Sequence, residues 1–298
     1  MSVTLTETPA APAKAGRSAP VPDRHHRGAG RWIVLAVVTV GALVMLVPFV
    51  FMLLNAFKAP GQYSTDGPLS WPSEFYTQGL RTYWTQVDFP QKLWNSTLIA
   101  GSVAVLAVAV SLLNAYALGI GRVRGRLWIV GAFLLANMLP QESLVYPLYY
   151  FAKEVGLYNT RLVVIIIFTV IQSAFGTYLL ASVLGTFPKS LLEAAALDGS
   201  GKWTILWRVV LPNVRPTLAV LLVFFFIWTW NEFLIPLVML IDNQTQTIPV
   251  ALASLQGDRL MDAPTTNAGA LISLVPAIVF FLIFQRTLSR GITVGAEK

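Results

Sequence analysis

The sequence has no cysteine and only two histidines, His25 and His26, among its 298 residues. Disulfide bonds are therefore excluded, and the Cys and His ligand sets of common zinc sites cannot be assembled, so we predict no metal site. The sequence also lacks a glycine-rich loop ending in Gly-Lys-Ser or Gly-Lys-Thr, which P-loop ATPases need to bind nucleotide. These absences argue against a metalloenzyme and against an ATPase.

Charge is scarce too, since charged residues make up 12% of the chain, against roughly 25% in a soluble domain. Hydrophobic residues make up 55%. A bilayer core about 30 Å thick needs about 20 mostly apolar residues per helix. Six stretches satisfy this requirement, at about 32–54, 93–120, 127–151, 162–187, 217–241 and 268–284. The short alternating segments of a membrane β-barrel are absent, so we predict an all-α membrane protein with six transmembrane helices.

The distribution of Lys and Arg predicts the orientation of these spans. With the N-terminus inside, 15 of the 21 basic residues fall on the cytoplasmic side. Both termini and the connection between spans four and five are then cytoplasmic. The net charge of +7 fits a basic inner face beside anionic lipid, and we expect no nucleic-acid partner. Residues 1–31 are predicted to be a disordered cytoplasmic tail, and residues 32–298 to be a six-helix transmembrane domain.

The connection at about 188–212 predicts a helix, a turn and a second helix on the cytoplasmic surface. Glu193, Ala194 and Ala195 belong to the first helix, and Gly199 stands where a helix would stop in the left-handed conformation. Ser200 is a plausible cap for the second helix, which we expect to end at Leu211-Pro212. The small Ala side chains and Gly199 would permit close approach by another protein, and Asp198 could hold the turn or meet a basic partner. An amphipathic connector resting on lipid is the alternative.

The spacing of this connection resembles a known signature. Glu193-Ala194-Ala195, Gly199, Val209 and Leu211-Pro212 are similar to the cytoplasmic loop of the integral membrane permeases of ATP-binding-cassette importers. Further segments resemble the maltose-type carbohydrate permeases: Asn95-Ser96, Asn114-Ala115-Tyr116-Ala117-Leu118, Pro147-Leu148-Tyr149, Gly156-Leu157-Tyr158-Asn159-Thr160, Trp230-Asn231-Glu232-Phe233-Leu234 and Gly291-Ile292-Thr293-Val294-Gly295-Ala296. Together these segments cover about residues 32–298.

The resemblance implies a permease subunit of the cell membrane that forms half of a pore in a carbohydrate importer. Its implied partners are a second homologous permease, two copies of a cytoplasmic ATPase and an extracytoplasmic solute-binding protein. ATP and Mg would be bound by the ATPase, so this chain would need no cofactor and would not be an enzyme. Glu193, Ala194, Ala195, Asp198, Gly199, Leu211 and Pro212 would couple it to the ATPase. The outer connection 242–267 would face the binding protein.

Polar side chains inside the spans are candidates for a translocation path, because they are costly in lipid and usually face protein or water. Glu142 and Glu232 both lie roughly 22 Å from the cytoplasmic side at a rise of about 1.5 Å per residue. With Gln172 and Asn231, they would form a polar layer suited to a hydroxyl-rich solute. The alternatives are that these groups hydrogen-bond between helices, or that Glu232 lies at the outer membrane interface.

Other functional classes share some of these sequence features. An importer permease for a solute other than sugar would share the same signature loop. A secondary transporter or channel would also carry polar groups at mid-membrane, but it would more often show related halves and has no need of a docking loop. A membrane enzyme would need converging ligands or a nucleophile with its base, and both histidines fall in the N-terminal tail.

Overall fold

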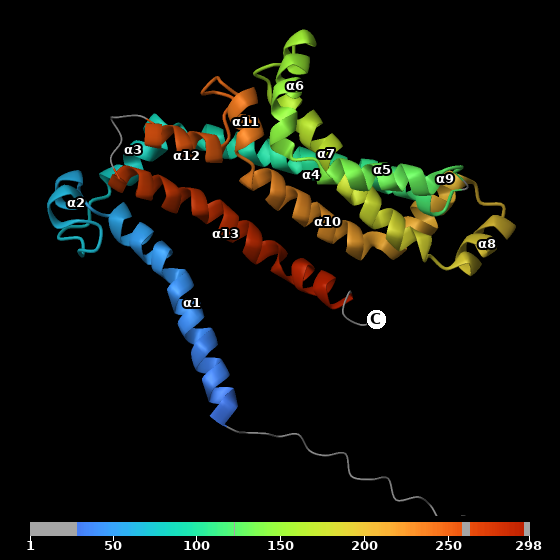
Figure 1. Ribbon diagram of the computed structural model, residues 1–298, viewed down its shortest axis with the longest axis horizontal. Helices are drawn as coiled ribbons and strands as arrows, with labels where there is room; N and C mark the ends of the chain where they lie inside the picture. Colours follow the sequence, from blue (N-terminus) through green and yellow to red (C-terminus); the bar gives the residue numbers. More distant parts are fainter. Residues whose placement is uncertain (1–28, 122, 258–262, 295–298) are drawn as a thin grey trace, which may run out of the picture. The chain divides into compact units, whose positions relative to one another are not determined.

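The computed structural model describes residues 29–121, 123–257 and 263–294, and within these residues it is helical, with no strand. The helices are α1 (Ala29–Ala56), α2 (Pro60–Asp66), α3 (Gln78–Gln86), α4 (Phe89–Gly119), α5 (Arg126–Met138), α6 (Gln141–Glu154), α7 (Arg161–Gly185), α8 (Lys189–Leu197), α9 (Lys202–Ile205), the π-helical turn η1 (Leu206–Val210), α10 (Leu211–Asn231), α11 (Leu234–Met239), α12 (Ile248–Gly257) and α13 (Ala263–Val294) (Figure 1). The prediction of an all-α protein is confirmed.

The chain divides into two units, residues 1–47 and 48–298. In the first unit, residues 30–47 belong to α1 and are all exposed, although nearly all are apolar. An apolar helix that buries nothing within its own unit belongs in lipid or against another protein. The predicted disordered tail, 1–31, lies outside the described residues except for its last three, which begin α1.

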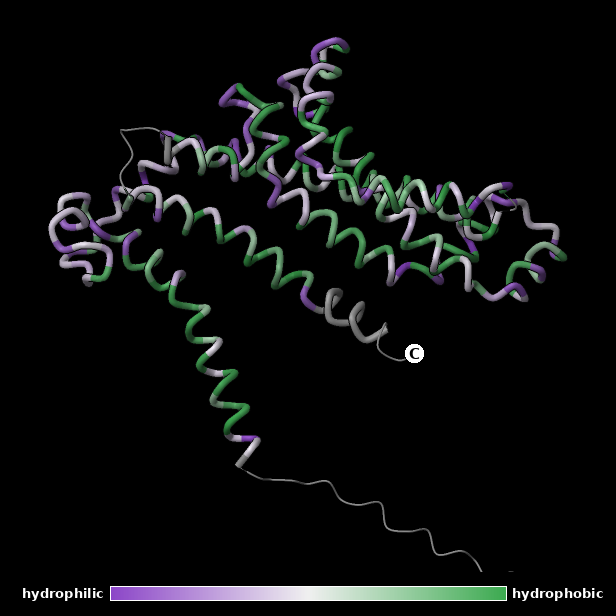
Figure 2. Tube along the Cα trace, in the orientation of Figure 1, coloured by the Kyte–Doolittle hydropathy of each residue, from purple (hydrophilic) through white to green (hydrophobic). Residues whose placement is uncertain are grey.

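Five helices are long and apolar enough to cross a membrane, and a sixth span results if the bent pair α5 and α6 is counted as one. Figure 2 shows that the long helices are mostly hydrophobic, while hydrophilic positions gather in the segments that join them. The predicted number of spans is therefore reached only with this bent pair, and the third span differs from the expectation of one continuous helix.

The third span is broken at Leu139 and Pro140, where α5 and α6 meet at 96°. Leu139 is extended, with φ −69° and ψ 130°. A residue before proline is disfavoured in the helical region, and Pro140 itself has no N–H to continue the hydrogen-bond ladder. The predicted span 127–151 therefore consists of two half-helices that run in different directions.

The predicted fifth span, 217–241, is also interrupted. α10 ends at Asn231, Glu232 is extended with φ −72° and ψ 134°, and α11 begins at Leu234. Pro236 explains the position of the break, because its ring would clash with the carbonyl of Glu232, four residues earlier, in a continuous helix. α11 packs against α6, so the two half-helices lie side by side (Figure 1).

The core of the second unit lies where α4 crosses α7, the most extensive helix contact in the structure. Gly176 permits this approach, since a Cβ there would lie 2.2 Å from Oγ of Ser111 and 3.0 Å from the ring of Phe225. Ser111 in turn donates to the carbonyl of Ser173 at 3.3 Å. Buried apolar side chains of α4, α7, η1 and α10 complete this cluster.

The connection between α1 and α4 is ordered around a buried lysine. Lys58 is fully buried, and its Nζ donates to Oδ1 of Asn55 and to the carbonyls of Gly67 and Pro68 at 2.9–3.1 Å. Burial lowers the pKa of Lys58, and the nearby carboxylate of Asp66 partly opposes that change. Farther along, Tyr83 of α3 is buried against α13 and shares a hydrogen bond of 2.9 Å with Ser273.

Candidate functional site

The predicted coupling connection contains a helix that ends in a Schellman motif. After α8, the N–H of Gly199 donates to the carbonyl of Ala196 and that of Ser200 donates to Ala195, each at 3.0 Å. Gly199 has φ +74°, a conformation that residues with a Cβ rarely adopt. Nothing lies within 4 Å of the position its Cβ would occupy. The turn is therefore sharply defined by its own backbone and has open space around it.

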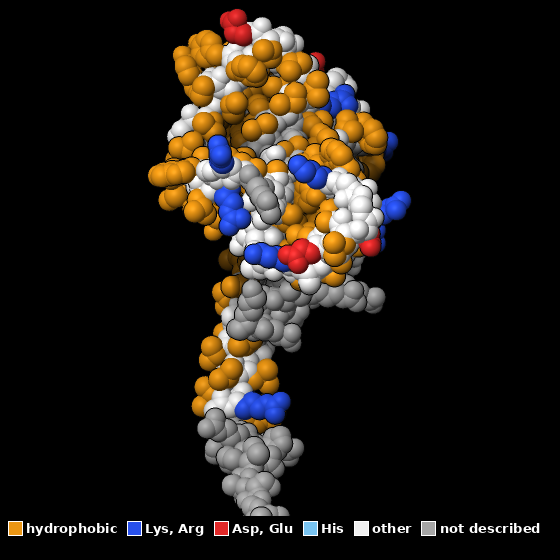
Figure 3. Space-filling view, turned by 90° about the vertical axis from the view of Figure 1, so that its right-hand side faces the viewer, with side chains coloured by type: hydrophobic (Ala, Val, Ile, Leu, Met, Phe, Trp, Pro, Cys, Tyr) orange, Lys and Arg blue, Asp and Glu red, His pale blue; other side chains and the backbone are white. Residues whose placement is uncertain are grey.

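Large apolar side chains are exposed on both sides of this turn. Leu197 is 90% exposed, Trp203 65% and Trp207 53%. Figure 3 views the molecule from the side on which α8 and α9 lie in Figure 1, and it shows Lys and Arg side chains among broad apolar surface. Lys189, Lys202 and Arg208 are all exposed in this region. Glu193, Ala194 and Asp198 are exposed as well, and Ala195 is half-buried.

Two details of the prediction are wrong. The residue before α9 that takes the N-cap position is Gly201, not Ser200, and no side chain caps this helix. Leu211-Pro212 does not end the second helix, which runs from Lys202 to Asn231 without interruption. The π-helical turn η1 makes this possible, because the N–H of Leu211 donates to the carbonyl of Leu206, five residues earlier, and the wider turn accommodates Pro212.

A side chain from α4 holds this second helix. The hydroxyl of Tyr116 donates to the backbone carbonyl of Lys202 at 2.9 Å. Two residues earlier, the amide of Asn114 donates to Oγ1 of Thr177 on α7 at 3.3 Å. Both residues belong to the Asn-Ala-Tyr-Ala-Leu segment, which resembles the maltose-type carbohydrate permeases but for which the sequence predicted no role. The segment connects α4 both to α7 and to the coupling connection.

The four candidate path residues occupy different surroundings. Glu142 is exposed in the first turn of α6 and lines an open pocket of about 410 Å³ between α6 and α11. Asn231 is exposed at the end of α10, where its amide donates to the carbonyl of Ile227 at 2.7 Å. Asn231 lines a separate pocket of about 160 Å³ beside α13. Glu232 is half-buried at the break after α10, within electrostatic reach of Glu142.

Gln172 differs from these three residues in its burial. It is fully buried on α7, and its Nε2 donates to Oγ1 of Thr229 on α10 at 2.8 Å. Among the described residues, its Oε1 has no hydrogen-bond partner. A buried acceptor without a partner costs about 1–3 kcal/mol. Within this chain, Glu142 and Glu232 lie beside the breaks of α5–α6 and α10–α11, within electrostatic reach of one another. Gln172 is linked to the second break through Thr229, whose carbonyl accepts from the N–H of Glu232 at 3.2 Å.

The connection after α11, which the sequence predicts to be on the outer side, is held by side chains to which the sequence analysis gave no role. Asn95 of α4 donates to the carbonyls of Gln244 and Gln246 at 2.9 and 2.8 Å, and buried Lys92 donates to the carbonyl of Asn243. Asn159, in the left-handed conformation with φ +61°, accepts from the N–H of Asp242 at 3.0 Å. We call residues 242–248 the outer segment. α12 follows it, and residues 258–262 of the predicted outer connection lie outside the described residues.

Comparison with known proteins identifies the family. Residues 120–294 match the binding-protein-dependent transport system inner membrane component family. The chain belongs to this family. It is therefore a multi-pass protein of the cell membrane and a transport component, not an enzyme.

Two relatives of this family member align over nearly their whole length. The trehalose transport system permease protein SugB of Mycobacterium tuberculosis (strain CDC 1551 / Oshkosh) is 32% identical over 91% of this chain and 98% of its own. The trehalose/maltose transport system permease protein MalG of Thermococcus litoralis is 31% identical over 86% of this chain and 93% of its own.

A solved structure shares the fold of this inner membrane component. A chain from the crystal structure of a bacterial ABC transporter involved in the import of the acidic polysaccharide alginate superimposes with a TM-score of 0.73 at 20% identity. The match covers 90% of this chain and 99% of that one. At this identity the likeness concerns the arrangement of helices.

Proposed function

We propose that this chain is the permease subunit of an ATP-driven, binding-protein-dependent carbohydrate importer and forms half of its pore. The observation that carries the proposal is the exposed turn at Gly199, flanked by Leu197 and Trp203, on a transport component without a nucleotide-binding loop of its own. Exposed apolar side chains at the end of a helix pair favour docking to another protein. The partner would be the ATPase that supplies the energy.

Carbohydrate is the proposed substrate class because the aligned relatives are named for trehalose and maltose transport. The path would run past the two helix breaks, where Glu142 and Glu232 lie. Broken helices and carboxylates inside a membrane are typical of solute pathways, since irregular backbone is tolerated there only in protein or beside water. Gln172 and Asn231 would contribute from α7 and α10.

The proposed assembly contains a second homologous permease, two copies of a cytoplasmic ATPase and an extracytoplasmic solute-binding protein. ATP and Mg would be bound by the ATPase, and this chain would hold neither. The excess of Lys and Arg in one set of connections supports placing both termini and the α8–α9 connection in the cytoplasm. Glu193, Ala194, Ala195, Asp198 and Gly199 would form the docking surface, and Leu211 and Pro212 would join it to the fifth span.

Reconstitution of the complete importer in proteoliposomes tests the proposal. Uptake of radiolabelled trehalose, maltose, lactose and raffinose is measured with ATP inside and binding protein outside. We expect uptake of at least one sugar that requires both. Uptake driven by an ion gradient without ATP would identify a secondary transporter. ATP-dependent uptake of other solutes but of none of these sugars would identify a permease with a different substrate class.

A further inference from the structure

The second half of the third span carries an unusual concentration of tyrosine. Tyr146, Tyr149 and Tyr150 lie on α6, and Tyr158 follows in the turn before α7. Glu142, Val145, Tyr146 and Tyr149 stand at positions i, i+3, i+4 and i+7 of α6, which places them on one helix face. Tyr146 is 70% exposed, which is high for so large an aromatic side chain. Neither the coupling connection nor the outer segment uses this face.

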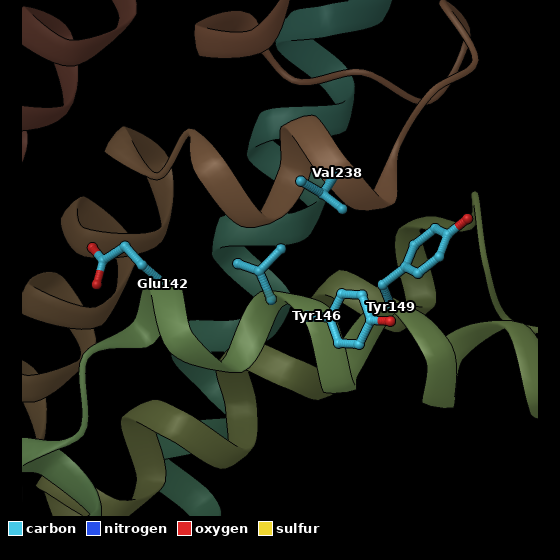
Figure 4. Close-up of a pocket in the computed structure, with 5 residues that line it drawn as sticks. Glu142, Tyr146, Tyr149 and Val238 are labelled. Carbon is cyan, nitrogen blue, oxygen red and sulfur yellow. The ribbon is translucent and has the colours of Figure 1, made fainter.

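This face lines the open pocket of about 410 Å³, together with Val238 from α11. Figure 4 shows Glu142 at the beginning of α6, the two tyrosines farther along the same helix, and Val238 on the neighbouring helix. Ligand pockets commonly measure roughly 300–1,000 Å³ and combine an apolar lining with a few polar groups. This pocket fits that description, with two aromatic rings and one carboxylate.

The rings are held in place from outside the pocket. Tyr149 makes edge contacts with Tyr150 and Tyr158, with ring centroids 5.4 and 5.1 Å apart. Nζ of Lys153 lies 4.8 Å from the centroid of Tyr149 and 5.5 Å from that of Tyr158. The hydroxyl of Tyr146 donates to that of Tyr150 at 3.2 Å. Aromatic side chains fixed before binding lose little conformational entropy when a ligand arrives.

The tyrosine rings and the Glu142 carboxylate together favour one chemical class of ligand. The C–H face of a pyranose ring stacks on a tyrosine ring, and its hydroxyls donate to a carboxylate, which is an acceptor only. A lipid acyl chain has no hydrogen-bond donor for the carboxylate of Glu142. An anionic sugar would meet the repulsion of that carboxylate, and the Lys153 ammonium already lies over the rings of Tyr149 and Tyr158.

We propose that the pocket formed by Glu142, Val145, Tyr146, Tyr149 and Val238 is a subsite of this chain for one pyranose ring of a neutral carbohydrate. The proposal rests on the proposed function and extends it, because it gives this subunit its own sugar contact and a reason to discriminate between neutral and acidic sugars. Tyr149 provides the stacking surface, and Glu142 sets the charge selectivity.

The absence of native cysteine allows a direct test in the complete importer. Tyr146→Cys and Tyr149→Cys are labelled with a membrane-impermeant methanethiosulfonate in each nucleotide state. Whichever of trehalose, maltose, lactose or raffinose is transported should slow the labelling of both cysteines, and the acidic disaccharide digalacturonate should not. Trp71→Cys, at a position 77% exposed outside the pocket, is the control and should be labelled equally with and without sugar.

Substitutions separate the roles of ring and charge. Tyr149→Ala should lower the uptake rate about tenfold, the order expected when a buried aromatic contact is lost, whereas Tyr149→Phe keeps the ring and should stay within about twofold. Adding Glu142→Gln to the Tyr146→Cys variant, which keeps the stacking ring of Tyr149, should allow digalacturonate to protect the introduced cysteine from labelling. Equal protection by digalacturonate without the Glu142→Gln substitution would overturn the charge selectivity.

Three outcomes bear on the proposal in different ways. If a neutral sugar is transported but neither cysteine is protected, the subsite is wrong and the importer function stands. If both cysteines are unreactive in every nucleotide state, the tyrosine face is covered by the second permease and the subsite is wrong. If none of the four sugars is transported, the carbohydrate function fails and the subsite fails with it.

Discussion

The hydroxyl of Tyr116 donates to the backbone carbonyl of Lys202, 86 residues later in the chain, at 2.9 Å. Tyr116 lies near the end of α4, and Lys202 begins the helix that follows the Gly199 turn. The bond therefore connects α4, one of the two helices that cross in the core, with the connection that we assign to the ATPase. Motion of the docking surface would reach α4 directly, without passing along the whole of α10.

Tyr116→Phe tests this connection. The ring keeps its place beside the core cluster, and only the hydroxyl is lost, which costs about 0.5–1.5 kcal/mol of stability. We expect normal membrane levels and fewer sugar molecules transported per ATP hydrolysed. Uptake and ATPase activity are measured together in proteoliposomes, and Tyr178→Phe, at an exposed position on α7, is the control. An unchanged ratio would restrict the bond to a structural role.

Gly199 and Gly201 form a matched pair for the docking surface. Both have open space where a Cβ would stand, but Gly199 has φ +74° and Gly201 has φ −70°. Gly199→Asp adds strain and a charge at the proposed contact, whereas Gly201→Asp adds the charge alone. We expect Gly199→Asp to abolish sugar-coupled ATP hydrolysis with the protein still inserted, and Gly201→Asp to have a smaller effect.

Glu193→Lys should be milder than either, because a charge at the rim of an interface mainly changes rates and salt dependence. Full uptake by the Gly199→Asp importer at normal membrane levels would contradict the docking assignment.

The long helices could be predicted from the sequence because membrane thickness fixes how many apolar residues a span needs. The breaks at Leu139 and Glu232 could not, since hydropathy is the same for one straight helix and for two half-helices. Pro140 and Pro236 did mark these places, but Pro212 and Pro216 lie in a continuous helix, so proline alone is ambiguous. A local π-helical turn made the difference at Pro212.

The hydrogen-bond partners of the polar residues could not be predicted from the sequence for a different reason. Tyr116 and Lys202, or Asn159 and Asp242, are separated by more than 80 residues, and no local pattern encodes such pairs. Helix rise predicts a shared depth for Glu142 and Glu232, and in the structure Glu142 is within electrostatic reach of Glu232. Depth along a helix does not determine which face a side chain occupies, so the burial of Gln172 could not be foreseen.

Gly176 should be intolerant of any side chain. A Cβ at this position would collide with Ser111 on α4, so Gly176→Ala should destabilise the protein by about 1–3 kcal/mol through overpacking. Gly185→Ala, on the same helix with nothing within 4 Å, is the control and should be nearly neutral. Thermal unfolding in detergent measures the difference. Equal melting temperatures for the two variants would show that α4 and α7 can separate without cost.

Asn159 should determine how firmly the outer segment is held. Its Oδ1 accepts from Asp242 and from Oγ1 of Thr245, at 3.0 and 3.2 Å. Asn159→Gly keeps the left-handed backbone and removes this acceptor, so amide hydrogen exchange in residues 242–248 should become about fivefold to tenfold faster. Asn159→Ala adds backbone strain of about 1–2 kcal/mol and should have a larger effect. Exchange at the wild-type rate in both variants would leave Asn95 and Lys92 as sufficient anchors.

Substitutions at Gln172 and Thr229 test whether the buried amide of Gln172 contributes to the translocation path or only joins α7 to α10. Replacing both partners of a buried hydrogen bond by apolar groups of similar shape is often close to neutral for stability, so the double variant Gln172→Leu, Thr229→Val should melt near the wild-type temperature. Each single variant leaves a polar group without its partner and should be less stable than the double.

If Oε1 of Gln172, which has no partner among the described residues, meets the solute when the pore opens, the double variant should still lose about tenfold in sugar uptake. Melting temperature in detergent and initial uptake rate in proteoliposomes are measured on the same preparations. A double variant that is stable and transports sugar at the wild-type rate would assign Gln172 to the contact between α7 and α10 alone, and would remove it from the path.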